Sequence, residues 1–189
     1  IMADKPKEIE VKIYSLATTA TESIIFLEEI EGSRLLPIWI GPVEGQAIAI
    51  RFSGIVLPRP LTHDLLLSVI NGAGFSLEKI AITELKDSTY FATLYIKKEK
   101  TIMEVDARPS DALALAVRAA CPIYVLEEIF NNSQVLRKPI SEDEVSQFKQ
   151  DLKSLKPKDI FGELKLKDVP KYIPPGQIGR ASCRERVCY

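Results

Sequence analysis

Two stretches of the chain repeat one pattern, and this repetition constrains the fold more than any other feature of the sequence. WIGPVEGQAIAIR runs from Trp39 to Arg51, and DARPSDALALAVR runs from Asp106 to Arg118. The matching pairs, all at one offset, are Pro42 with Pro109, Glu44 with Asp111, Ala47 with Ala114, Ala49 with Ala116 and Arg51 with Arg118. Five matches at a single offset make chance a poor explanation, so the sequence predicts an internal duplication.

Each stretch follows a region in which apolar and polar residues alternate. Ile9, Val11 and Ile13 alternate with charged residues, which is typical of a strand with one buried face. Further strands are predicted over residues 23–29, 34–40, 77–85, 90–97 and 101–107, and a short one over 122–126. The sequence therefore predicts two three-stranded meanders, one in each copy.

Proline begins the predicted helix in both copies, because the amide that proline lacks is unpaired at the first helical position. The helix over residues 42–53 is apolar on several sides, so we expect it to be deeply buried. A second helix, over 63–73, is expected to be capped by Thr62 and closed by Gly74. The predicted fold class is α+β, an internally duplicated motif of three strands and two helices, with mixed sheets packed around buried alanine-rich helices.

The duplicated domain is expected to span residues 8–136, with copies over about 8–74 and 75–136. Ser141 with Glu144 fits a capping box, and apolar residues at helical spacing predict a C-terminal amphipathic helix from Glu142 to Leu155. This helix would lie in an extension over 137–162. Residues 163–189 form a tail, and its end, from Ile178, resembles translated vector sequence.

Composition excludes several function classes. The formal charge of −1, from 25 basic and 26 acidic residues, gives no broad cationic field, so any phosphate site must be local. No apolar run approaches the roughly 20 residues that a spanning helix needs, and we expect a soluble, cytoplasmic protein without a membrane segment. The three cysteines do not have the spacing of zinc ligands.

The second copy carries charges that the first copy lacks. Asp106 and Arg108 stand where the first copy has Trp39 and Gly41. Asp106 and Asp111 flank the turn from strand to helix and, with Glu44, could bind Mg²⁺ or Mn²⁺, because magnesium commonly takes one or two carboxylates plus phosphate oxygens. The alternatives are an ion pair between Asp106 and Arg108 and carboxylates that only cap their own helices.

The segment before the second helix holds another candidate cluster. Arg59 lies between two prolines, and His63 is the only histidine in the sequence. Histidine titrates near neutral pH and can act as a general acid or base, while arginine can clamp a phosphate. The alternative is that His63 has a structural role, as histidines near helix starts often do.

Three blocks of the sequence, LPIWIGPVEGQAIAI, PRPLTHDLL and VDARPSDALALAVR, resemble signature blocks of the bifunctional nuclease family. The resemblance runs from about Glu8 to Cys121. It implies an α+β fold built from a duplicated strand and helix motif, and cleavage of both DNA and RNA. Gly45 departs from the pattern, since alanine is usual at that position.

The leading hypothesis is a nuclease of low sequence specificity that depends on a divalent metal. His63, Asp106 and Asp111 would be catalytic, Arg59 and Arg108 would bind the phosphate, and Asp106, Asp111 and Glu44 would bind the metal. The alternative from another class is a non-catalytic module that binds DNA or RNA, or that regulates. A third reading is a structural duplication whose charges serve folding. The sequence leaves the oligomeric state open, a homo-oligomer included.

Overall fold

The computed structural model describes residues 6–19 and 21–137, so the predicted helix over 142–155 and the tail lie outside the described residues. The described chain is α+β, in agreement with the predicted class. Its strands are β1 (Glu8–Thr18), β2 (Ser23–Glu29), β3 (Arg34–Ile40), β4 (Ser76–Lys86), β5 (Thr89–Lys98), β6 (Thr101–Ala107), β7 (Ile123–Leu126) and β8 (Leu136–Arg137). Its helices are α1 (Pro42–Phe52), α2 (Thr62–Gly72), α3 (Pro109–Ala119) and α4 (Glu127–Asn132).

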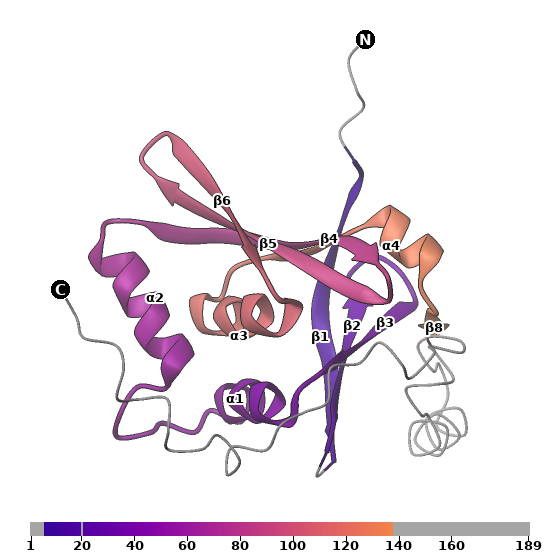
Figure 1. The fold of residues 1–189 in the computed structure, drawn as a ribbon, viewed down its shortest axis with the longest axis horizontal. Helices are drawn as coiled ribbons and strands as arrows, with labels where there is room; N and C mark the ends of the chain where they lie inside the picture. The colour runs from indigo at the N-terminus through magenta and orange to yellow at the C-terminus, as the bar shows by residue number, and fades with distance from the viewer. Residues whose placement is uncertain (1–5, 20, 138–189) are drawn as a thin grey trace, which may run out of the picture.

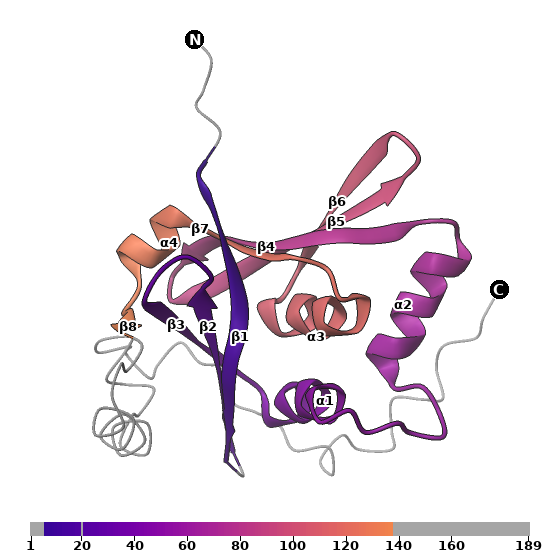
Figure 2. The same cartoon turned by 180° about the vertical axis from the view of Figure 1, so that it is seen from behind.

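All eight described strands form one mixed sheet in the order β6-β5-β4-β7-β1-β2-β3-β8. The two meanders do not pair with each other directly, because β7 lies between them, parallel to β4 and antiparallel to β1. Strand β1 runs steeply and β4 nearly horizontally in Figures 1 and 2, so the sheet twists strongly between the two meanders. In both meanders, three antiparallel strands precede a helix that begins with proline. The internal duplication itself stays a prediction.

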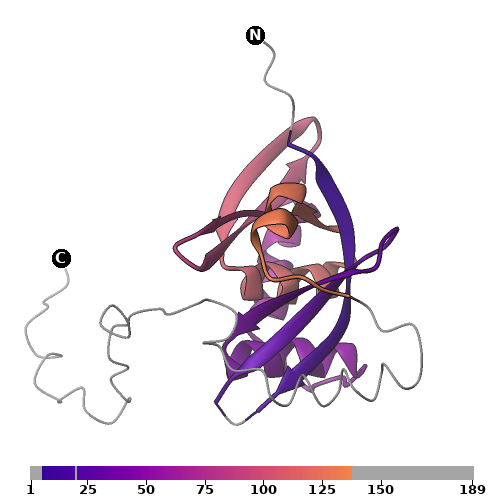
Figure 3. The ribbon, with the colours of Figure 1, turned by 90° about the vertical axis from the view of Figure 1, so that its right-hand side faces the viewer.

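Helix α3 forms the centre of the core. Residues 112–116 of this helix are almost completely buried, and their small alanines allow close contact with β4, β5, α1 and α2. Helix α1 lies below α3 in Figures 1, 2 and 3, and only Gly45 and Ile48 of it are buried. The expected deep burial of the helix over 42–53 is therefore wrong, because α3 occupies the position between the sheet and the other helices.

Helix α1 approaches β2 closely at Gly45. A Cβ atom added at Gly45 would lie 2.3 Å from Oγ of Ser23 and 2.6 Å from its Cβ atom, closer than real contacts allow. The glycine therefore permits a helix-to-strand distance that alanine would not. This contact gives a physical reason for glycine at position 45, where alanine is usual in the family that the sequence resembles.

The start of α2 differs from the prediction. Thr62 is the first helical residue and Leu61 is the N-cap, so the expected capping by Thr62 is wrong. The carboxylate of Asp64 accepts a 2.9 Å hydrogen bond from the backbone N–H of Leu61, which closes the first turn in place of a hydroxyl cap. Gly74, with φ of 79°, follows the end of the helix as predicted.

Among residues 6–19 and 21–137, no helix is long and apolar enough to cross a membrane.

Candidate functional site

Side chains from the first turns of three helices meet in one cluster. Glu44 comes from α1, His63 from α2, and Asp111 from α3, while Arg108 is the N-cap residue of α3. Pro42 and Pro109 stop the preceding strands and fix where α1 and α3 begin. We call these four charged or titratable residues the junction cluster.

Asp111 is the centre of the junction cluster. Its Oδ2 atom accepts a 2.7 Å hydrogen bond from Nε of Arg108, and its Oδ1 atom accepts one of 3.1 Å from Nη2. Nε2 of His63 lies 3.2 Å from the same Oδ1 atom. The carboxylate thus joins a two-pronged arginine contact to a histidine that comes from 48 positions earlier in the chain.

Glu44 joins the cluster through the same arginine. Nη1 of Arg108 lies 3.2 Å from Oε1 of Glu44, so one guanidinium bridges carboxylates of α1 and α3. Among the described contacts, Asp111 meets Arg108 at the start of its own helix and His63 of α2, and Glu44 meets Arg108 of α3. These contacts run to side chains rather than to backbone amides. The capping alternative considered from the sequence is not what these two carboxylates do here.

The contacts within the junction cluster favour the charged forms of Asp111 and Arg108. Burial raises the pKa of Asp111, but the hydrogen bonds from Arg108 and His63 outweigh burial and hold that pKa below the ordinary value of an aspartate. The hydrogen bond to Asp111 raises the pKa of Arg108 in turn. The Arg108 side chain is still 66% exposed, so it can contact a ligand in solvent.

Asp106 does not join the junction cluster. Its neighbours Val105 and Ala107 pack against the core, and because residues alternate along a strand, exposed Asp106 faces the other side of the sheet. Within the described part of the chain, the ion pairs of Arg108 go to Glu44 and Asp111 and not to Asp106. The ion pair between Asp106 and Arg108, weighed as an alternative from the sequence, is absent from these contacts.

Arg59 lies on a different part of the surface. It lines a pocket of about 290 Å³ together with Arg51, Asp64 and Arg118, between the loop before α2 and the C-terminal part of α1. Arg108 does not line this pocket. The two arginines predicted to bind phosphate therefore do not share a pocket, although Arg59 and His63 are close in sequence.

Arg108 borders a second pocket, of about 320 Å³, beside the junction cluster. The strand-to-helix turns of both meanders and the β4–β5 turn form its walls, and they include Trp39, Tyr90 and Ser110. In the sequence, Trp39 stands out only as the counterpart of Asp106. One sequence signal could have identified Trp39 as a pocket residue: it is an aromatic residue at a strand end, shortly before Gly41 and Pro42, where a side chain can line a cleft.

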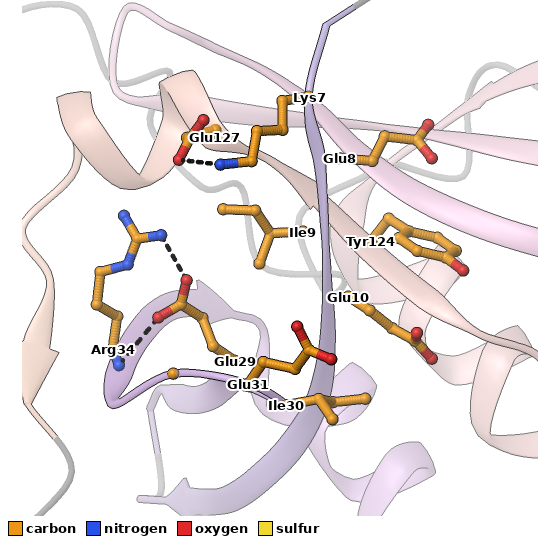
Figure 4. A pocket seen from close by; sticks show the side chains of 11 residues that line it. Lys7, Glu8, Ile9, Glu10, Glu29, Ile30, Glu31, Arg34, Tyr124 and Glu127 are labelled. Atoms are coloured by element: carbon orange, nitrogen blue, oxygen red, sulfur yellow. Dashed lines mark hydrogen bonds and ion pairs between the residues drawn. The ribbon is translucent and has the colours of Figure 1, made fainter.

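The pocket in Figure 4 has a different character. It measures about 420 Å³ and lies between β1, the β2–β3 hairpin and the start of α4. In its walls Lys7 pairs with Glu127, and Arg34 pairs with Glu29 of the same hairpin, as the dashed lines show. Glu10 and Glu31 add negative charge, whereas Glu8 is paired with Lys79. An acidic pocket of this kind repels phosphate, so it is a poor candidate for binding nucleic acid.

The junction cluster fits a divalent cation only in part. Glu44 and Asp111 both contact the guanidinium of Arg108, and magnesium commonly uses one or two carboxylates. Across residues 6–19 and 21–137, however, no three His, Cys, Asp or Glu side chains come together as a metal-binding group. Asp106 accordingly does not complete the predicted set of three carboxylates.

Comparison with known proteins gives an independent result. A family model described as the bifunctional nuclease domain matches residues 25–138, more than half of the chain. An uncharacterized protein of Mycobacterium tuberculosis, Rv1829, is 37% identical over 161 residues, which cover 80% of this chain and 96% of that protein.

Plant proteins are more distant and longer. Bifunctional nuclease 1 of Oryza sativa subsp. japonica is 29% identical over 141 residues, which cover 71% of this chain and 43% of that protein. Bifunctional nuclease 2 of Arabidopsis thaliana is 28% identical over 115 residues, which cover 59% of this chain and 35% of that protein. The matched family model leaves out β1 but covers β3, nearly all of β2, the whole second meander and all four residues of the junction cluster. The chain belongs to the bifunctional nuclease family.

Proposed function

We propose that this protein is a nuclease of low sequence specificity that hydrolyses phosphodiester bonds of DNA, RNA or both at the junction cluster. The observation that carries the proposal is the contact of His63 with an Asp111 carboxylate that Arg108 also holds. His63 can transfer a proton, Asp111 can orient its ring, and the exposed guanidinium of Arg108 can bind phosphate. Together these groups can support phosphodiester hydrolysis. Membership of the bifunctional nuclease family supports the same reaction class.

The proposed role of His63 follows from its ring contacts. When Nε2–H donates to Oδ1 of Asp111, Nδ1 keeps its lone pair and can accept a proton. A water molecule that gives its proton to Nδ1 attacks phosphorus, the bond from phosphorus to the leaving oxygen breaks, and the leaving oxygen takes up a proton from solvent. Asp111 fixes the ring orientation and stabilises the imidazolium that forms.

Arg108 is the proposed phosphate ligand. Its guanidinium is exposed and has five N–H donors, so it can bind a phosphate oxygen while it keeps a contact with Asp111. The N-terminal ends of α1, α2 and α3 add partial positive charge in the same region. Arg59 is proposed to contact a neighbouring phosphate of the same strand from its separate pocket.

Glu44 and Asp111 are the proposed holders of Mg²⁺ or Mn²⁺, which would supply positive charge for the oxygens of the scissile phosphate. The proposal does not use Asp106 as a ligand, because Asp106 faces the other side of the sheet. The pocket beside Arg108, with Trp39 and Tyr90 in its walls, offers aromatic surface for a base next to the scissile phosphate.

The test measures cleavage of end-labelled single- and double-stranded DNA and RNA, with chelator, Mg²⁺ or Mn²⁺. His63→Asn and Asp111→Asn are each expected to lower kcat by about 100-fold or more, and Arg108→Ala to raise KM as well. Glu78→Gln, which changes a distant exposed carboxylate paired with Lys97, is the matched control and should keep full activity. Cleavage that survives all three cluster variants would overturn the proposal.

The second candidate is a module that binds nucleic acid without cleaving it. It is favoured by the finding that, within residues 6–19 and 21–137, no three His, Cys, Asp or Glu side chains form a metal-binding group. It predicts salt-dependent binding that weakens in Arg108→Ala, together with no cleavage at any metal concentration. The same set of variants therefore separates the two functions.

A further inference from the structure

The pocket of about 320 Å³ that borders Arg108 holds an enclosed hydroxyl group. Ser110, at the second helical position of α3, lines this pocket and is only 6% exposed. Among residues 6–19 and 21–137, its Oγ atom has no hydrogen-bond partner. A buried hydroxyl is normally hydrogen-bonded, so one that reaches a pocket without a protein partner is positioned for a ligand there.

The matching stretch from Trp39 to Arg51 has no such group. Val43 is the counterpart of Ser110 at the offset that pairs Pro42 with Pro109, and it is 73% exposed. Both helices begin with proline, so neither needs a hydroxyl at this position in order to start. The serine therefore belongs to the pocket rather than to the start of its helix.

Two aromatic side chains of the same pocket present ring surface. Trp39 is half-buried and its Nε1 atom is buried, so the pocket meets its ring rather than its N–H group. The hydroxyl of Tyr90 donates a 3.2 Å hydrogen bond to Oγ of Ser133, outside the pocket lining. Flat aromatic surface of this kind stacks on other planar rings and tolerates different ring substituents.

Charge suits a ligand that is anionic at one end. Among the described residues that line the pocket, Arg108 is the only charged one, and its side chain is 66% exposed. No carboxylate stands among those lining residues, in contrast to the acidic pocket of Figure 4. Arg108 also belongs to the junction cluster, so a phosphate on its guanidinium can lie between the cluster and the pocket. A phosphate joined to a planar ring is the chemistry of a nucleotide.

We propose that this pocket binds one unpaired base of a DNA or RNA strand whose adjacent phosphate Arg108 holds. The inference rests on the proposed function and names its substrate class, which is single-stranded nucleic acid or unpaired stretches of a folded one. The base stacks on the rings of Trp39 and Tyr90, and the hydroxyl of Ser110 bonds its polar edge. A hydroxyl both donates and accepts, so this contact suits any base, in keeping with low sequence specificity.

A base inside a duplex cannot occupy this pocket. Its ring faces are stacked on neighbouring bases, and only its edges are accessible in the grooves. To meet the aromatic walls the base must leave the stack, which costs free energy for a paired base and little for an unpaired one. We therefore expect kcat/KM for a single strand to exceed that for the same sequence in a duplex by about 10-fold or more.

The fluorescence of Trp39 tests the inference without any mutation, because Trp39 is the only tryptophan of the chain. The full chain is titrated in chelator with an oligothymidylate of about eight nucleotides. Stacking should quench the fluorescence to saturation. A sugar-phosphate chain of equal length without bases, and a long blunt-ended duplex, should need at least about 10-fold higher concentrations for the same quenching.

Binding of the same oligothymidylate, carrying a terminal fluorophore, is then measured by anisotropy for variants of the pocket. Ser110→Ala should raise Kd by about 5-fold and Trp39→Leu by about 10-fold or more. The matched controls are Ser76→Ala and Tyr95→Leu, which remove a hydroxyl and a ring outside the pocket lining and should change Kd by less than about 2-fold. Circular dichroism checks the fold, and Ser110→Ala carries the comparison if Trp39→Leu does not fold.

The outcomes separate this inference from the nuclease proposal. Equal quenching by the chain without bases or by the duplex would overturn the inference, and so would an unchanged Kd in Ser110→Ala. Selective quenching together with no cleavage of any substrate would support the base site and contradict the nuclease. Cleavage by a chain whose Trp39 fluorescence does not respond would keep the nuclease and overturn the base site.

Discussion

Arg118 of α3 and Asp64 of α2 form a hydrogen-bonded ion pair, with 2.7 Å between Nε and Oδ1. The Arg118 side chain is 4% exposed and also donates to the carbonyl oxygens of Ala114, at 2.8 Å, and Ala47, at 3.2 Å. One arginine thus ties α1, α2 and α3 together. Because Asp64 follows His63 directly, the pair also fixes the turn that places His63 beside Asp111.

Replacing Asp64 should destabilise the protein. Asp64→Asn leaves the buried Arg118 guanidinium without its anionic partner, and we expect the free energy of unfolding in urea to fall by about 2 kcal/mol. Asp64 is itself partly exposed, which keeps the loss below that of a fully buried pair. Glu78→Gln, which breaks an exposed pair with Lys97, should change the free energy of unfolding by less than about 1 kcal/mol. Equal losses in the two variants would contradict a structural role for the buried pair.

Stability should fall in acid because of Asp64 and Asp111. Hydrogen bonds from Leu61 and Arg118 overcome the effect of burial and hold the pKa of Asp64 below its ordinary value, and Arg108 and His63 lower the pKa of Asp111 in the same way. A lowered folded-state pKa gives stability that is present above the unfolded pKa of about 3.9 and is lost as pH falls through the folded value.

Urea unfolding between pH 7 and pH 3 measures this loss. The double variant Asp64→Asn, Asp111→Asn is less stable at pH 7, and its stability should decline less steeply from about pH 5 downward. Parallel pH profiles for the variant and the wild type would show that other carboxylates cause the acid sensitivity.

Gly45→Ala should destabilise the fold, although alanine favours helix by about 1 kcal/mol. The added Cβ atom meets Ser23 at 2.3 Å, so α1 must move away from β2, at a cost of about 1–3 kcal/mol beyond the helix propensity. Gly72→Ala in α2 is the control, since nothing lies within 4 Å of the position that its new methyl group would take, and the change should be neutral or stabilising. Thermal unfolding compares the two, and Ser23→Gly should recover part of the loss in Gly45→Ala.

The two aspartates near the start of α3 should differ in their effect on cleavage. Asp106→Asn should change kcat by less than about 3-fold, because Asp106 is exposed on the side of the sheet away from His63. Asp111→Asn should lower kcat by about 100-fold or more. The measurement is single-turnover cleavage of one labelled substrate at saturating enzyme. A large loss of cleavage rate in Asp106→Asn would mean that Asp106 takes part in the reaction.

Much of the local structure could be predicted from the sequence. The predicted strands over 23–29 and 34–40 coincide with β2 and β3, and Pro42 and Pro109 begin α1 and α3 as expected. These features depend on residues a few positions apart, through alternation, helical spacing and the missing proline amide. The predicted cap of α2 was wrong because the helix begins one residue earlier than predicted, so Thr62 lies inside its first turn and Asp64 bonds the amide of Leu61.

The sequence by itself determined the α+β class, the order of the elements and the residue types available for phosphate chemistry, because short-range backbone and solvent preferences set the first two and composition sets the third. Only the tertiary structure decided that β7 joins the two meanders into one sheet and that α3, rather than α1, fills the centre. It also brought Glu44, His63 and Arg108 to Asp111 and turned Asp106 away. These contacts join segments far apart in the chain, and they depend on how the helices pack, which local patterns do not encode.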